Sequence, residues 1–134
     1  GDEAEIRLSA PGKYVLDGGK REVCLKIFPV EKNLQIPKKM YTKWLDYDKI
    51  KGSPCVRTRK QGDYLVVNSA GGRKKLNRIF IDEKIPAGLR DQIPVVAAGS
   101  EILWIPGGRM NEQYKITSTT GRVLELHYQG GALA

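Results

Sequence analysis

The sequence is poor in the residues that build metal sites. It contains one histidine, His127, and two cysteines, Cys24 and Cys55, which stand far apart in the chain. A structural zinc site needs four ligands in closely spaced groups, so this set predicts no metal site. Both cysteines stand in apolar or turn settings, and we expect them to be reduced structural thiols of a cytoplasmic protein.

Groups that could converge on a reaction are also scarce. His127 lies in an alternating stretch near the end of the chain, which is typical of an ordinary strand residue, and no cysteine–histidine or serine–lysine pattern accompanies it. The carboxylates are scattered and mostly stand beside lysine or arginine, so paired acid–base chemistry is unsupported. The sequence therefore predicts no catalytic residue and no bound cofactor in this chain.

Long hydrophobic runs are absent as well. No apolar run approaches the ~20 residues of a membrane-spanning helix, so we expect no membrane partner. The length of 134 residues suits one domain with a core of its own. The chain begins Gly1-Asp2-Glu3, without methionine or a signal-peptide pattern, and we interpret it as a processed or excised piece of a longer protein.

The chain is, by contrast, rich in positive charge. Its formal net charge is +8, and most of that excess lies between Arg57 and Pro94. This stretch holds four acids and nine basic residues, namely Arg57, Arg59, Lys60, Arg73, Lys74, Lys75, Arg78, Lys84 and Arg90. Because it also has regular apolar positions and glycine turns, it indicates an ordered cationic surface whose first candidate partner is nucleic acid.

The hydrophobic pattern predicts an α+β fold in which mixed, mostly antiparallel short strands flank one helical insert. Spacing of i, i+3 and i+4 at Leu76, Ile79 and Phe80 predicts a helix over 74–84, and a second short helix follows Pro86. We place Phe80, Trp44 and Trp104 in the core. Alternating segments predict strands within 5–30 and at 55–59. Further strands are predicted at 41–47, 64–67, 95–98, 101–105, 114–117 and 123–128, with turns between them.

Two details of the basic stretch bear on function. In the predicted strand 55–59, Arg57 and Arg59 point the same way, and Asp63 reads as a turn or orienting residue. Gly71-Gly72 is expected to enter the helix, where its amides together with Arg73 and Lys74 would meet a backbone phosphate. A simple turn before a solvated helix start is the alternative.

Aromatic residues are sparse in this stretch, which favours a grip on the backbone of a folded RNA over base stacking. Two other functional classes stay open on these residues. One is a stand-alone protein that binds structured RNA, and the other is a protein-interaction module whose charge serves solubility.

A series of short motifs follows in order along the chain: Arg57-Thr58-Arg59-Lys60-Gln61-Gly62-Asp63, Gly72-Arg73-Lys74-Lys75-Leu76, Asp82-Glu83-Lys84-Ile85-Pro86, Arg90, Ile93-Pro94, Trp104 and Gly107. Together they resemble the C-terminal domain of bacterial tRNA(Ile)-lysidine synthetase, and the resemblance covers about residues 45–128. It implies a fold shared with a domain of the phenylalanyl-tRNA synthetase β chain. It leaves the first 40 residues without an assignment.

The resemblance also implies a function. In that family an N-terminal catalytic domain with an ATP-pyrophosphatase loop attaches lysine to the wobble cytidine of tRNA(Ile), and that loop is absent from this sequence. The implied partners are therefore tRNA(Ile) and the N-terminal domain of the same protein, which would bind the ATP, while a homodimer stays open. The contacts it implies are Arg57, Arg59, Arg73, Lys74, Lys75 and Arg90, with Arg109 as a secondary candidate, and the basic stretch adds Lys60, Arg78 and Lys84.

Overall fold

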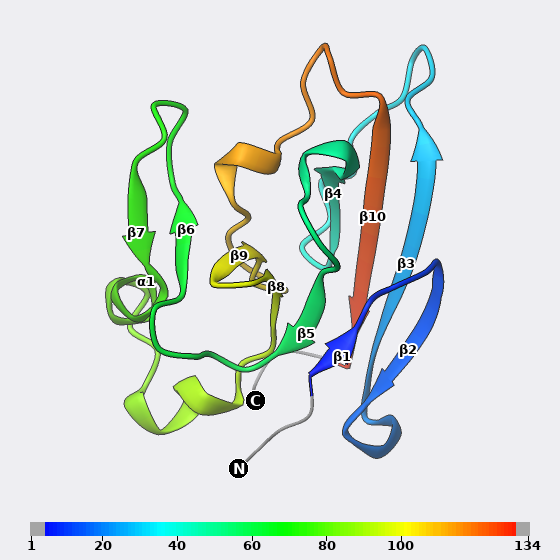
Figure 1. Cartoon of the computed structure of the whole chain (residues 1–134). Helices are drawn as coiled ribbons and strands as arrows, with labels where there is room; N and C mark the ends of the chain where they lie inside the picture. The colour runs from blue at the N-terminus through cyan, green and yellow to red at the C-terminus, as the bar shows by residue number, and fades with distance from the viewer. Residues whose placement is uncertain (1–4, 131–134) are drawn as a thin grey trace.

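The ten strands of the computed structural model, which describes residues 5–130, form two sheets (Figure 1). The four-stranded sheet is antiparallel throughout and has the order β2 (Gly12–Leu16), β3 (Arg21–Pro29), β10 (Arg122–Gln129) and β4 (Thr42–Asp46). The six-stranded sheet has the order β1 (Ile6–Arg7), β5 (Cys55–Arg57), β8 (Val95–Ala98), β9 (Glu101–Trp104), β6 (Tyr64–Val66) and β7 (Arg73–Lys75). Only β6 and β9 pair in parallel in it. The prediction of an α+β fold is confirmed.

The N-terminal segment, for which the motifs gave no assignment, is part of both sheets. Ile6 of β1 lies opposite Val56 of β5. Strand β3 pairs with β10 along its length, from Glu22 opposite Gln129 to Pro29 opposite Arg122. Residues 5–30 therefore belong to the same folding unit as the basic stretch.

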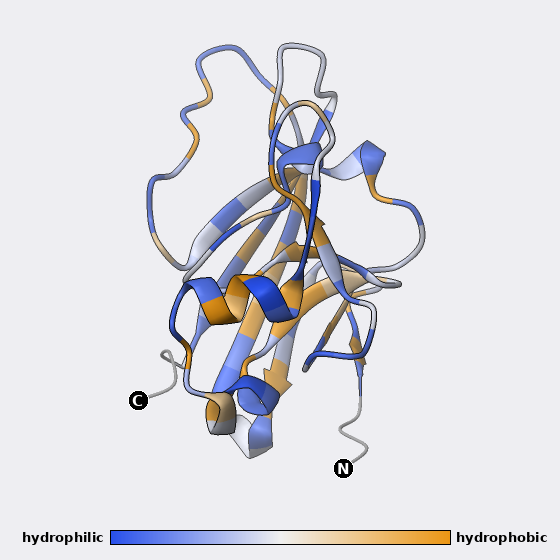
Figure 2. Cartoon of the chain, turned by 90° about the vertical axis from the view of Figure 1, so that its left-hand side faces the viewer, coloured by the Kyte–Doolittle hydropathy of each residue, from blue (hydrophilic) through white to orange (hydrophobic). Residues whose placement is uncertain are grey.

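Alternation along β5 and β8 divides the core into two layers, because successive strand residues face opposite sides of a sheet. Val56 and Val96 pack toward the four-stranded sheet with Leu45 and Leu124. Their neighbours Cys55, Val95 and Ala97 pack on the other side, where the helix α1 (Leu76–Asp82) buries its apolar residues. Figure 2 looks onto this side and shows α1 with hydrophobic and hydrophilic residues alternating along its ribbon.

The large side chains predicted to be in the core are there. Trp104 is 0% exposed, Phe80 is 1% exposed and Trp44 is 8% exposed. The short helix predicted after Pro86 is a 3-10 helix at Ala87–Gln92. Within residues 5–130, the helices are too short and too polar to cross a membrane.

Three predicted elements were wrong in extent or type. The helix begins at Leu76, because Arg73–Lys75 pairs with β6 as strand β7. Strand β5 ends at Arg57 and leaves Arg59 in a loop. The predicted strand 114–117 is absent: Glu112–Tyr114 is a 3-10 helix in which the Asn111 side chain accepts a hydrogen bond from the amide of Gln113. Such local side-chain bonds compete with strand pairing.

Candidate nucleic-acid interface

Arg57 is held inside the protein. Its Nη1 and Nη2 donate to the two carboxylate oxygens of Asp63, at 2.9 Å each, and Nη2 also donates to the carbonyl of Gly99 at 2.8 Å. The hydrogen bond with Asp63 is the main cause that raises the pKa of the Arg57 guanidinium. A phosphate would have to displace this bidentate pair, so we leave Arg57 out of the proposed contacts.

The same ion pair shapes the loop that carries the next two basic residues. Asp63 Oδ2 also accepts the amide hydrogen of Lys60 at 2.7 Å, and the Asp63 carbonyl accepts from the amide of Leu76 at the start of α1. Asp63 is thus the orienting residue that its position after Gly62 suggested. It ties the β5–β6 loop to α1.

Arg59 leaves that loop toward α1. Its Nη1 donates to Asn77 Oδ1 at 2.9 Å, and its Nε donates to Asp91 Oδ1 at 2.7 Å. The side chain is 24% exposed. Arg59 and Arg57 therefore have separate sets of partners, in contrast to the shared direction expected from a continuous strand.

Gly71-Gly72 lies between the turn of the β6–β7 hairpin and β7, so its predicted place at a helix entrance was wrong. The side chain Oδ1 of Asn68 accepts hydrogen bonds from the amides of Ala70 and Gly72, and the Asn68 carbonyl accepts from the amide of Gly71. These amides are already satisfied. They do not form the phosphate cradle that we expected there.

Several predicted cations gather around α1. Lys74 of β7 pairs with Asp82 at the end of the helix. The hydrogen bond from Lys74, reinforced by the charges of Arg78 and Arg109, holds the pKa of Asp82 below its usual value. Segments that are distant in sequence therefore converge here. We call the set Arg59, Lys74, Arg78, Lys84, Arg90 and Arg109 the α1 face.

Two members of the α1 face, Lys84 and Arg90, follow the end of the helix in the chain. Lys84 is exposed and has φ +58°, and its amide donates to the carbonyl of Ile81. Arg90 is half-buried, and its Nε donates to the carbonyl of Ile85 at 2.9 Å. Arg90 therefore braces the Ile85-Pro86 turn, while the Lys84 side chain stands in solvent.

Arg73 and Lys75 lie on the opposite side of β7 from Lys74. The Arg73 guanidinium stands over the Tyr64 ring at 4.5 Å from its centroid, a favourable cation–π geometry. Arg73 and Tyr64 line a polar hollow of about 300 Å³ together with Lys49 and Lys51. Sequence reasoning missed these two lysines, because only the folding of the turn after β4 brings them beside the basic stretch.

Lys60 stands apart from both groups. Its side chain is 59% exposed and pairs with Glu5, next to the edge strand β1. Among the ten predicted site residues, five are exposed and make no ion pair within residues 5–130, namely Arg73, Lys75, Arg78, Lys84 and Arg109. They lie on β7, α1 and the two turns that adjoin them.

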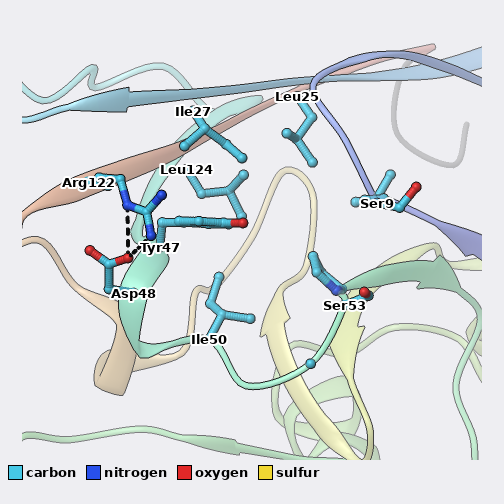
Figure 3. A pocket seen from close by; sticks show the side chains of 12 residues that line it. Ser9, Leu25, Ile27, Tyr47, Asp48, Ile50, Ser53, Arg122 and Leu124 are labelled. Carbon is cyan, nitrogen blue, oxygen red and sulfur yellow. Dashed lines mark hydrogen bonds and ion pairs between the residues drawn. The ribbon is translucent and has the colours of Figure 1, made fainter.

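A second hollow, of about 280 Å³, opens between the two sheets (Figure 3). At its mouth Arg122 stacks on the Tyr47 ring and donates from Nε to Asp48 Oδ1 at 3.0 Å. Its one cation is therefore neutralised by a carboxylate. In the part of the chain that the structure describes, no group of three or more histidine, cysteine or acidic residues could hold a metal ion.

Comparison with known proteins identifies the family to which this chain is similar. Residues 55–126 match the model described as "TilS substrate C-terminal domain". The chain is 49% identical over 88 residues, 66% of its length, to a tRNA(Ile)-lysidine synthase of Caldanaerobacter subterraneus subsp. tengcongensis. It is 32% identical over 127 residues, 95% of its length, to one of Dehalococcoides mccartyi.

The similarity extends to a solved structure. A crystal structure of a TilS C-terminal domain superposes with a TM-score of 0.75 at 28% identity, covering 94% of this chain and 95% of that one. The matched segments make up 19% of the Caldanaerobacter protein and 26% of the Dehalococcoides protein. The chain thus spans about a fifth to a quarter of the length of these relatives.

Proposed function

Because the chain belongs to the TilS substrate C-terminal domain family, we propose that it is a tRNA-binding module that contacts tRNA(Ile) through the exposed cations of β7 and the α1 face. In this proposal the chain supplies binding energy and orientation. A catalytic domain elsewhere in the parent protein binds ATP and attaches lysine to the wobble cytidine. The relatives that share this domain, which are tRNA(Ile)-lysidine synthases, support that division of labour.

The observation that carries the proposal is the set of five exposed cations without an ion pair. Surface lysine and arginine commonly lie beside carboxylates, as Lys74 and Asp82 do here. Arg73, Lys75, Arg78, Lys84 and Arg109 instead make no ion pair within residues 5–130, and they lie on neighbouring elements. Such a surface attracts a polyanion, and binding releases the counterions that were condensed on the polyanion.

The framework behind these cations is held by packing and hydrogen bonds, which suits a positioning role. α1 is anchored by three buried side chains and by the Asp63 carbonyl at its first residue. The β6–β7 hairpin is closed by Asn68 at its tip. A preorganised surface loses less conformational entropy on binding, so more of the electrostatic attraction appears as affinity.

Backbone contacts of this kind fix the register of an RNA without reading its bases. Discrimination of tRNA(Ile) from other RNA must then come from the shape of the RNA and from contacts to unpaired nucleotides. A filter-binding titration separates the alternatives. We expect tRNA(Ile) to bind more tightly than an unrelated folded RNA of similar length.

Equal affinity for the two RNAs would reject tRNA specificity and favour a general binder of structured RNA. Absence of binding to either RNA at low salt would reject the proposal and favour a protein-interaction module. Lysine transfer or ATP turnover by this chain alone would contradict the proposed division of labour.

A further inference from the structure

An apolar groove of about 450 Å³ lies beside the α1 face. Its lining comes from the start of β3, the two residues before β4, the end of α1, the segment from Ile85 to Pro94, the turn from Ile105 to Gly108 and the end of β10. Met40, Tyr41, Ile85, Leu89, Pro106 and Tyr128 are among its apolar residues. Met40 is 64% exposed, so the groove is open to a partner.

The groove presents an aromatic ring. Tyr41 and Tyr128 lie with ring centroids 6.0 Å apart and planes inclined by 33°. Tyr128 is buried, at 3% exposure, whereas Tyr41 is half-buried and faces the hollow that it lines. A Cβ at Gly107 would come within 2.9 Å of Tyr41 Cε1, so glycine is what allows the turn to approach this ring.

Basic residues adjoin this apolar lining. Arg21 lines the groove directly, although it is paired with Asp17. Lys84 adjoins the lining residue Ile85, and Arg109 follows the lining residue Gly108. The lining includes one carboxylate, that of Glu83. An apolar groove with cations at its border matches a ligand that is flat and apolar in one part and anionic in another.

We propose that this groove binds an unpaired stretch of one or two nucleotides, with a base packed against Tyr41 and the adjoining phosphates at Lys84 and Arg109. The proposal rests on the function proposed above. It adds a contact to an unpaired base for an RNA whose backbone the exposed cations bind. Base-on-aromatic contact bordered by cations is the usual construction of single-strand sites. An apolar peptide would fill the same groove but leave Lys84 and Arg109 unused.

The composition of the basic stretch argued against base stacking, since it offers only Tyr64 and Phe80. The fold changes that argument. It brings Tyr41, which immediately precedes β4, and Tyr128 from the end of β10 to the Ile85-Pro86 turn, which lies within the basic stretch. A cationic surface and an aromatic groove thus adjoin each other although their residues are far apart in sequence.

The test uses two RNA hairpins that share one duplex. One ends blunt, and the other carries a four-nucleotide 3′ single-stranded extension that contains 2-aminopurine. We expect the extension to raise the affinity of the hairpin for the wild-type chain by about fivefold or more. The 2-aminopurine fluorescence should be quenched on binding. Tyr41→Phe keeps the aromatic ring and should keep both effects. Tyr41→Leu keeps an apolar side chain and should abolish both effects without weakening the binding of the blunt hairpin.

The outcomes separate this inference from the proposed function. If the wild-type chain binds both hairpins equally and the fluorophore is not quenched, the groove does not take RNA and a protein partner becomes its occupant. The proposal would likewise be overturned if the extension raised the affinity of Tyr41→Leu as much as that of the wild-type chain. If neither hairpin binds but tRNA(Ile) does, the groove inference fails and the proposed function stands. If none of the three RNAs binds, both the groove inference and the proposed function are rejected.

Discussion

Arg57 and Asp63 form a bidentate ion pair in which both distances are 2.9 Å and the side chains are only 4% and 2% exposed. The pair closes the loop between β5 and β6, and through the Asp63 carbonyl it fixes the start of α1. A basic residue in the middle of a cationic motif is thus a structural element. In our proposal its exposed neighbours, and not Arg57 itself, contact the RNA.

Removing one partner of this pair should destabilise the fold. In Arg57→Ala the Asp63 carboxylate stays buried without its counter-ion, and we expect a loss of about 3–5 kcal/mol in the free energy of unfolding. Chemical denaturation measures this loss. The double variant Arg57→Met/Asp63→Leu should be less destabilised than either single variant, because it leaves no unpaired charge. An Arg57→Ala protein of unchanged stability but lower RNA affinity would return Arg57 to the contact surface.

Gly107 offers a test of the turn against Tyr41. Its φ is +82°, and an added Cβ would meet the Tyr41 ring at 2.9 Å. Gly107→Ala should therefore cost about 1–3 kcal/mol in unfolding free energy. Gly52 is the matched control, because its φ is +78° and nothing lies within 4 Å of its ideal Cβ. Equal losses at the two positions would show that only backbone strain matters.

Tyr114 should make stability depend on pH in the alkaline range. Burial, and then its hydrogen bond with Glu101, raises the pKa of the phenol in the folded chain. The folded state then holds this proton more tightly than the unfolded state, whose pKa is about 10. The stabilisation is complete below about pH 10 and is lost as the pH rises toward the folded pKa.

Denaturation of wild type and Tyr114→Phe across this range provides the check. The free energy of unfolding should fall more steeply with pH above about 10 in the wild type than in the variant. Parallel curves would contradict the assignment. Other tyrosines contribute to both curves alike and cancel in the comparison.

Most of the fold follows from the sequence, because its elements are determined by local periodicity. Two-residue alternation located β3 and β10, an apolar run between turns located β8, and the i, i+3, i+4 spacing located α1. The strand predicted at 114–117 failed for a reason that periodicity does not report. Asn111, Thr117 and Thr120 satisfy nearby amides with their own side chains, which favours turns over a ladder.

The site was less predictable, because its geometry depends on contacts between distant segments. Charge clustering found the basic stretch, but the burial of Arg57 depends on the carbonyl of Gly99 as well as on Asp63. Only the fold brings Lys49 and Lys51 to the same hollow as Arg73. Only the fold likewise brings Tyr41 to the same groove as Ile85. No spacing rule within one segment reports such approaches.

Single charge deletions should separate contact residues from bystanders. We expect Arg78→Ala and Arg109→Ala each to weaken tRNA(Ile) binding and to reduce the magnitude of its salt slope by about 1. Lys26→Ala is the matched control, because Lys26 is exposed on β3 in the other sheet. A change in Lys26→Ala as large as in Arg78→Ala would mean that net charge, and not the α1 face, controls affinity.

The central claim is that the exposed cations of β7 and the α1 face grip the tRNA backbone, and the salt dependence of tRNA(Ile) binding tests it most directly. With about five phosphate contacts, a log–log plot of affinity against salt concentration should have a slope of roughly −3.5 to −4.5. The combined variant Arg73→Ala/Arg78→Ala/Arg109→Ala should bring the slope to about −1 to −2 with the fold intact. A wild-type slope near zero, or the same slope in the combined variant, would contradict the claim.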